Sequence, residues 1–112
     1  SESLAVALEA GNLPVAVQNI LYRGAILAHQ GDTEAGLRAL EEGEAMAKEH
    51  GMAEHQAVAE LFRGHIALLA QDRAAALRHC RRAAEIASAT GNRKLVAEID
   101  RALAACRSDS GQ

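Results

Sequence analysis

The apolar and polar positions of this chain recur with a period of 40 residues. The segment 21–26, with the sequence LYRGAI, returns as LFRGHI at 61–66. Without any gap, ten of the 32 positions in the window 21–52 are identical in the window 61–92. A fixed period of this length is typical of a solenoid, in which each unit buries its apolar face only against its neighbours. Because solenoids usually serve as binding surfaces, the pattern favours a protein-interaction module.

Regularly spaced glycine and aspartate residues divide this pattern into helices. Gly11, Gly51 and Gly91 fit helix C-caps, because glycine adopts the left-handed conformation at low cost. Asp32 and Asp72 are placed to begin new helices, since their side chains can accept bonds from the free amide groups there. Ala at 26 positions, Leu at 13 and a single Pro also favour helix. The predicted helical segments are 2–10 (the end of a helix), 14–30, 33–50, 53–70, 73–90 and 94–106.

The length of the chain fits a single domain covering residues 1–112. This domain holds two complete repeats, at 13–52 and 53–92, followed by the terminal helix. The terminal helix aligns best if two residues are dropped, so that residues 96–99 (VAEI) match residues 58–61 (VAEL). Arrays of this kind usually need about three units to be stable. We therefore expect that the terminal helix solvates one end, or that exposed apolar ends pack on further repeats or on a second copy of the chain.

The small residues of the pattern resemble the tetratricopeptide repeat. In that family, small residues mark the closest helix contacts, and a Gly-Asp pair lies at the turn between the two helices of a repeat. The matching positions are Gly24/Gly64 in the first helix, Gly31-Asp32 and Asp72 at the turn, and Gly36/Ala76, Gly43/Ala83 and Leu37/Leu77 in the second helix. The family period is about 34 residues, so the helices here are longer by about a turn in total.

Three other family features are missing from this chain. Ile20 or Glu60 stands in place of the early aromatic, Arg23 or Arg63 in place of the Leu before the glycine, and no Pro closes the repeat. The chain is similar to the long-helix variant found in bacterial ATP-dependent LuxR-type regulators and other large signal-responsive activators. The resemblance implies an all-α, TPR-like α-solenoid of antiparallel helix pairs. Its first helices would line a concave groove, and its second helices would form the convex side.

The polar strip of the first helix supplies the candidate binding residues. This helix is apolar on most sides, and its strip consists of Asn19, Arg23 and Gln30 in one repeat and Glu60, Arg63 and Gln71 in the next. If the strip faces the groove, Arg23 and Arg63 form a two-point clamp for a carboxylate or an acidic peptide, which guanidinium groups bind bidentately. The alternative is structural, with each arginine stem covering apolar surface while its head pairs with a glutamate.

Two further sets of equivalent residues have a structural and a functional interpretation. Tyr22 and Phe62 are either core residues or anchors for a partner side chain, and we place Tyr22 and His65 at the edge of the groove. The pairs 41–42 (EE) and 81–82 (RR) either form a solvated face with weak ion pairs or face each other across the convex surface.

The composition of the chain argues against several classes of function. The net charge of −3 supplies no overall basic face for nucleic acid, although residues 78–82 (RHCRR) form a local basic patch. No apolar stretch approaches the ~18–20 residues of a membrane span, and we expect a cytoplasmic protein. Cys80 and Cys106 lack metal-site spacing and are expected to be reduced thiols, with a disulfide as the alternative. Because the histidines do not converge, we expect no metal and no cofactor.

Catalytic motifs are absent from the sequence. It contains no Gly-rich phosphate loop, no His-Glu-x-x-His and no nucleophile elbow, and its carboxylates are expected on exposed faces, so an enzyme would need two acids to meet in the groove. We predict a non-catalytic protein–protein interaction scaffold that binds a partner peptide or protein segment, with no direct contact to nucleic acid or membrane. The candidate contacts are Asn19, Tyr22, Arg23, Arg63 and His65. The alternatives are a regulatory or oligomerisation fragment of a larger bacterial transcriptional regulator, and a small helical ligand-binding domain or enzyme.

Overall fold

Five helices follow one another in the computed structural model, which describes the backbone of residues 12–110 and the side chains of residues 12–107. They are α2 (Leu13–His29), α3 (Thr33–Glu49), α4 (Ala53–Leu69), α5 (Arg73–Ser88) and α6 (Arg93–Ser110). The described residues form no strand, which confirms the predicted all-α class. The predicted helical segment 2–10 lies outside the described residues.

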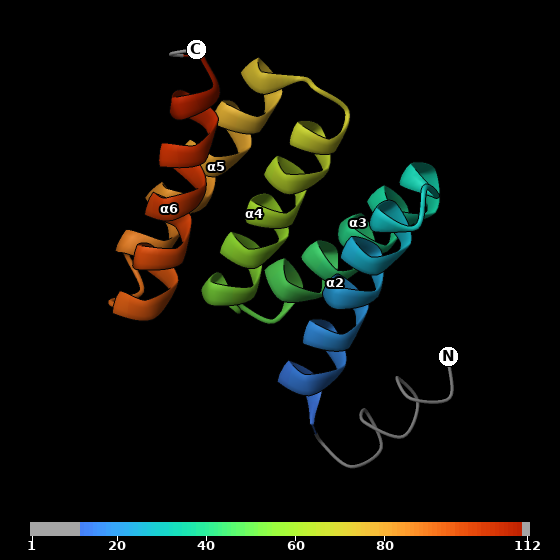
Figure 1. The fold of residues 1–112 in the computed structure, drawn as a ribbon. Coiled ribbons are helices and arrows are strands. Elements are labelled where there is room, and N and C mark those ends of the chain that lie inside the picture. The colour runs from blue at the N-terminus through green and yellow to red at the C-terminus, as the bar shows by residue number, and fades with distance from the viewer. Residues whose placement is uncertain (1–11, 111–112) are drawn as a thin grey trace.

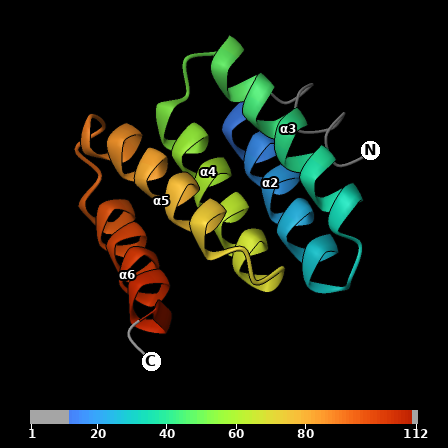
Figure 2. The ribbon, with the colours of Figure 1, turned by 90° about the horizontal axis from the view of Figure 1, so that it is seen from above.

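The helices pack in an alternating order, in which each contacts the next and α4 contacts all the others. Figure 1 shows α2, α4 and α6 in one layer, with α3 and α5 behind them. Within the front layer α2 packs on α4 and α4 packs on α6, while α3 lies against both α2 and α4. Seen from above, the array runs from α2 and α3 at one end to α6 at the other (Figure 2).

The ends of the helices follow the predicted turn chemistry. Asp32 and Asp72 cap α3 and α5, because their Oδ1 atoms accept from the amides of Ala35 (3.2 Å) and Ala75 (3.1 Å). Gly31 has a positive φ of 97°, in the turn that links α2 to α3. At the equivalent turn of the next repeat, Gln71 adopts φ 63°, a conformation that costs a residue with a Cβ.

Two glycines allow α2 and α3 to approach closely. A Cβ added to Gly24 would lie 2.7 Å from the carbonyl oxygen of Gly36, and one added to Gly36 would lie 2.6 Å from that of Gly24. Because the atoms in the way are backbone, neither helix can make room by changing a rotamer. The small residues predicted to mark the closest helix contact do so in this pair.

The front-layer helices begin 40 residues apart, at Leu13, Ala53 and Arg93. Equivalent positions in them therefore differ by 40 in number, although equivalent residues of α2 and α6 differ in burial. In α6 the stripe formed by Leu95, Ile99, Leu103 and Cys106 is buried against α4 and α5. The start of α6 keeps the ungapped spacing. Its buried residues instead follow the predicted two-residue gap, since Leu95, Ile99 and Ala102 then match the buried Val17, Leu21 and Gly24 of α2.

Candidate binding cleft

An open cleft of ≈ 280 Å³ crosses the front layer and is shared by three helices. Gln18, Leu21 and Tyr22 come from α2, Glu54, His55 and Val58 from α4, and Asn92, Lys94, Leu95 and Glu98 from α6 and the turn before it. Leu21 and Leu95 are buried and form an apolar floor. Gln18, Val58 and Glu98, one from each helix, occupy equivalent positions of the 40-residue period.

Tyr22 lines this cleft and begins a row of rings that continues through Phe62 to His65. The Tyr22 and Phe62 rings lie 5.5 Å apart at 41°, and the Phe62 and His65 rings lie 6.3 Å apart at 38°. Tilted pairs at this distance stabilise each other by about 0.5–1.5 kcal/mol beyond the area that they bury. Phe62 packs on the core, whereas Tyr22 leaves 48% of its surface exposed and accepts a 3.3 Å bond from Gln18 Nε2. Tyr22 therefore presents a held but accessible ring.

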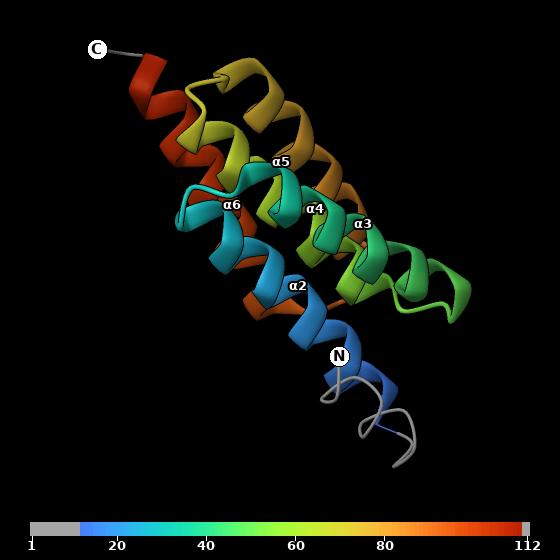
Figure 3. The same ribbon diagram turned by 90° about the vertical axis from the view of Figure 1, so that its right-hand side faces the viewer.

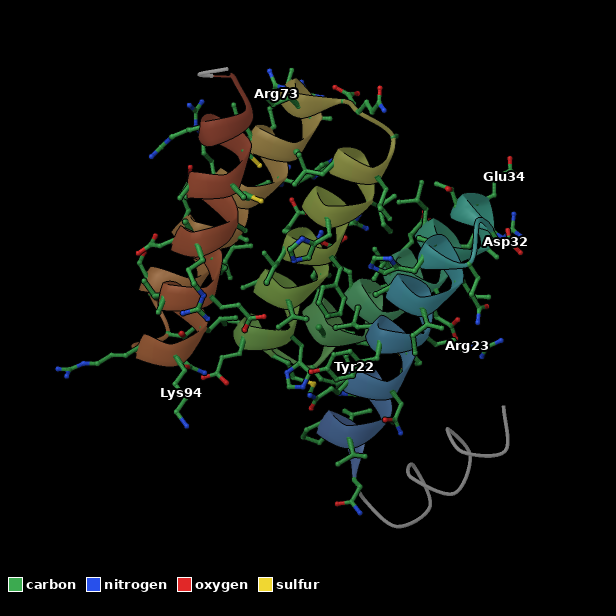
Figure 4. All side chains as sticks on the ribbon, viewed as in Figure 1. Tyr22, Arg23, Asp32, Glu34, Arg73 and Lys94 are labelled. Carbon is green, nitrogen blue, oxygen red and sulfur yellow. The ribbon has the colours of Figure 1, made fainter. Side chains whose placement is uncertain are left out.

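The rim of the cleft is charged. It carries two carboxylates, Glu54 and Glu98, and one ammonium group, Lys94, all on exposed residues. Figure 4 shows Lys94 extending from the end of α6, with Tyr22 between α2 and α4. Glu98 also acts on His65: burial lowers the pKa of His65, the Glu98 carboxylate opposes that shift, and His29 adds to it. His65 thus stands among charged groups of α2 and α6, although its own surface is exposed.

The five residues predicted to bind a partner fall in three places. Tyr22 lines the cleft, and His65 adjoins it through Phe62. Asn19 and Arg23 lie exposed on α2 and do not line the cleft, and the Arg23 side chain points away from α4 (Figure 4). Arg63 lies between helices. Arg23 and Arg63 therefore do not present two free guanidinium groups to this cleft.

Arg63 belongs to a charge cluster that joins α3, α4 and α5. Its Nη1 atom lies 2.8 Å from Glu44 Oε1 and 2.6 Å from Glu60 Oε1. Burial lowers the pKa of Arg63, but hydrogen bonds to Glu60 and Glu44 outweigh it, and the net shift is upward. For Arg63, this geometry matches the structural interpretation, in which the guanidinium pairs with glutamates.

Glu60 is the buried centre of this cluster. It is 4% exposed, and its Oε2 atom lies 3.5 Å from His79 Nδ1 and 3.7 Å from Arg82 Nε. The expectation that the carboxylates lie on exposed faces is therefore wrong for Glu60, whose carboxylate is surrounded by Arg63, His79 and Arg82. Among the described helices α3 and α5 do not touch, so residues 41–42 and 81–82 do not pair directly across the surface, and Arg82 reaches α4 instead.

Several residues that line the cleft were not among those predicted to bind a partner: Gln18, Val58, Lys94 and Glu98. The sequence does relate three of these lining positions to one another, because 18, 58 and 98 are equivalent positions of the 40-residue period. The two-residue gap moved Glu98 out of that register and placed it beside Glu60. With the ungapped register, the polar residues of the terminal helix would have been aligned with Gln18 and Val58.

Other features of the described residues concern metals, thiols and membranes. Cys80 and Cys106 are free thiols and both are buried. The described residues contain no group of three or more His, Cys, Asp or Glu side chains that could hold a metal ion. Within the same residues, no helix combines the length and the apolar character needed to cross a bilayer.

Comparison with known proteins gives no relative: the chain matches no protein-family model, no curated protein and no solved structure.

Proposed function

We propose that this protein is a TPR-like α-solenoid that binds a segment of a partner protein in the α2–α4–α6 cleft, without catalysing a reaction. The observation that carries the proposal is the cleft shared by α2, α4 and α6, with an apolar floor and an accessible aromatic ring. The alternating helix packing and the 40-residue register support the solenoid.

The chemistry of the cleft favours an apolar side chain with a basic neighbour as its occupant. A volume of ≈ 280 Å³ lies at the lower limit of small-molecule pockets and suits one or two inserted side chains. Tyr22 and Val58 would contact the apolar anchor, as aromatic residues commonly do in interface hot spots. Glu54 and Glu98 outnumber Lys94 on the rim, which favours a cation beside that anchor. An acidic peptide was favoured by Arg23 and Arg63, and neither lines this cleft.

Glu54 and Glu98 also meet the condition stated above for an enzyme, because two acids line one cleft. Both residues are exposed, and the cleft is open to solvent. General acid–base catalysis by a carboxylic acid at neutral pH generally needs burial or a close partner that shifts its pKa. Exposed carboxylates on a rim are better suited to charge complementarity with a partner, and this supports binding over catalysis.

A displayed library of random peptides, selected on the full chain, tests the proposal. We expect enriched peptides to share an aromatic or aliphatic residue next to Lys or Arg. Fluorescence anisotropy should then show that Tyr22→Ala weakens binding about tenfold or more. Leu37→Ala is the matched control, since Leu37 is a large apolar residue of similar exposure on α3, outside the cleft. Equal loss in both variants, or no enriched motif, would refute the cleft as the binding site.

A further inference from the structure

In α4 and α6, one face of the helix packs on the helix pair that precedes it. In α6 this face is Leu95, Ile99, Leu103 and Cys106, and in α4 it is His55, Ala59, Arg63 and Ile66. The same register in α2 gives Val15, Asn19, Arg23 and Ile26, which we call the leading face of α2. Because the three faces are equivalent by position, what covers the one on α4 shows what the leading face of α2 is suited to contact.

On α4 this face is covered by α2 and α3. Ala59 and Ile66 are buried in a cluster with Leu40 and Ala47 of α3. The guanidinium of Arg63 meets the carboxylate of Glu44, also on α3, at 2.8 Å. The contact therefore combines apolar and small side chains of an amphipathic helix with one arginine–glutamate pair.

On α2 the equivalent residues are exposed. Val15 and Ile26 leave 50% and 55% of their surfaces accessible, although their partners by register are partly or fully buried. Asn19 and Arg23 are exposed as well, and no ion pair joins Arg23 to another described residue. Figure 3 looks onto this end of the array, with α2 and α3 in front.

The opposite end of the array has a different character. In α6 the positions that correspond to Ala57, Leu61 and Gly64 are Ala97, Arg101 and Ala104, and all three are exposed. This end is solvated by a charged residue and small side chains, whereas the leading face of α2 combines two large aliphatic residues with an arginine. None of these three positions carries a carboxylate, so this end does not reproduce the glutamate that Arg63 meets on α3.

We propose that the leading face of α2 binds, in trans, an amphipathic helix built like α3, with a glutamate opposite Arg23 and small or apolar side chains over Val15 and Ile26. The proposal rests on the contact that the equivalent face of α4 makes with α3, and on charge complementarity. It is independent of the function assigned to the cleft. On α2 the leading face adjoins the cleft, because Tyr22 and Ile26 are four residues apart on one side of the helix.

The chain itself supplies the probe, a labelled peptide with the sequence of residues 33–50. A cross-link between positions 34 and 38, both exposed in α3, keeps this short peptide helical, which isolated helices of this length are not reliably. We expect the full chain to bind it, and Arg23→Glu to weaken binding about tenfold or more. The peptide with Glu44→Lys should restore binding to Arg23→Glu and lose it for the original chain.

Arg38→Glu is the matched control, because it reverses another exposed arginine, on α3, and it should change binding by less than about twofold. Circular dichroism confirms that each variant is folded. Three outcomes would overturn the proposal: no binding by the helical peptide, equal effects of Arg23→Glu and Arg38→Glu, or binding only after residues 1–11 are removed. The last result would mean that the chain's own N-terminal residues fill the face.

Discussion

At the scale of single residues, Glu60 is the buried charged residue in the described part of the chain. A carboxylate that is 4% exposed is stable only when cations and hydrogen bonds replace the water that it has lost. Arg63 supplies the shortest of these contacts, at 2.6 Å, and also holds Glu44. Replacing Arg63 should therefore destabilise the fold, because the carboxylates of Glu60 and Glu44 would lose their cation.

We predict that Arg63→Met lowers the free energy of unfolding by about 3 kcal/mol, because a buried carboxylate loses its partner. Urea unfolding followed by circular dichroism measures this change. Arg38→Met, at an exposed arginine on α3, should stay within about 0.5 kcal/mol of the original chain. The double variant Glu60→Leu/Arg63→Met should recover part of the loss, since the uncompensated charge is removed. If Arg63→Met is as stable as Arg38→Met, the charge cluster does not stabilise the fold.

At the scale of the helix, the turns between helices differ between repeats in one informative way. Gly31 and Gln71 occupy the same position, and both have a positive φ. A left-handed conformation costs a residue with a Cβ roughly 1–2 kcal/mol, whereas glycine adopts it freely and loses about 0.4–1 kcal/mol in greater unfolded-state entropy. The second repeat therefore keeps a strained residue where the first does not.

Replacing Gln71 with glycine should stabilise the protein by about 0.5–1 kcal/mol, which corresponds to a rise of a few degrees in the melting temperature. Gly31→Gln is the reciprocal variant and should lower the melting temperature by a similar amount. Thermal unfolding by circular dichroism compares the two. A fall in melting temperature for Gln71→Gly would show that the glutamine side chain stabilises the turn by more than its backbone conformation costs.

The helices were predictable from the sequence, and their environments were only partly so. Asp32 and Asp72 cap their helices as expected, and predicted helix ends differ from the observed ones by a few residues at most. Arg23 and Arg63 show the limit. They share one register position, but a described helix pair covers only Arg63. A repeat predicts which positions are equivalent, whereas the ends of an array place equivalent residues in unlike surroundings.

At the scale of the whole molecule, the core divides into two clusters that meet at α4. Leu40 belongs to the cluster at the α2–α3 end, and Ile99 belongs to the cluster at the α6 end, where both thiols are buried. Burial raises the pKa of Cys80 to about 11, and the neighbouring Cys106 adds to the shift. The thiolate is the reactive form of Cys80, and both thiols are buried. They should therefore react slowly in the folded chain and report when their end opens.

Neither α2 nor α3 has a backbone contact with α6, so the two ends of the described fold can open separately. We predict that Ile99→Ala and Leu40→Ala, each costing about 2–5 kcal/mol, affect the thiols unequally. Ile99→Ala should speed thiol modification by an aromatic disulfide reagent strongly, because α6 detaches from α5. Leu40→Ala should speed it much less at the same loss of global stability, measured by urea unfolding. Equal acceleration by both variants would mean that the thiols react only after the whole chain unfolds, and that α4 couples both ends into one cooperative unit.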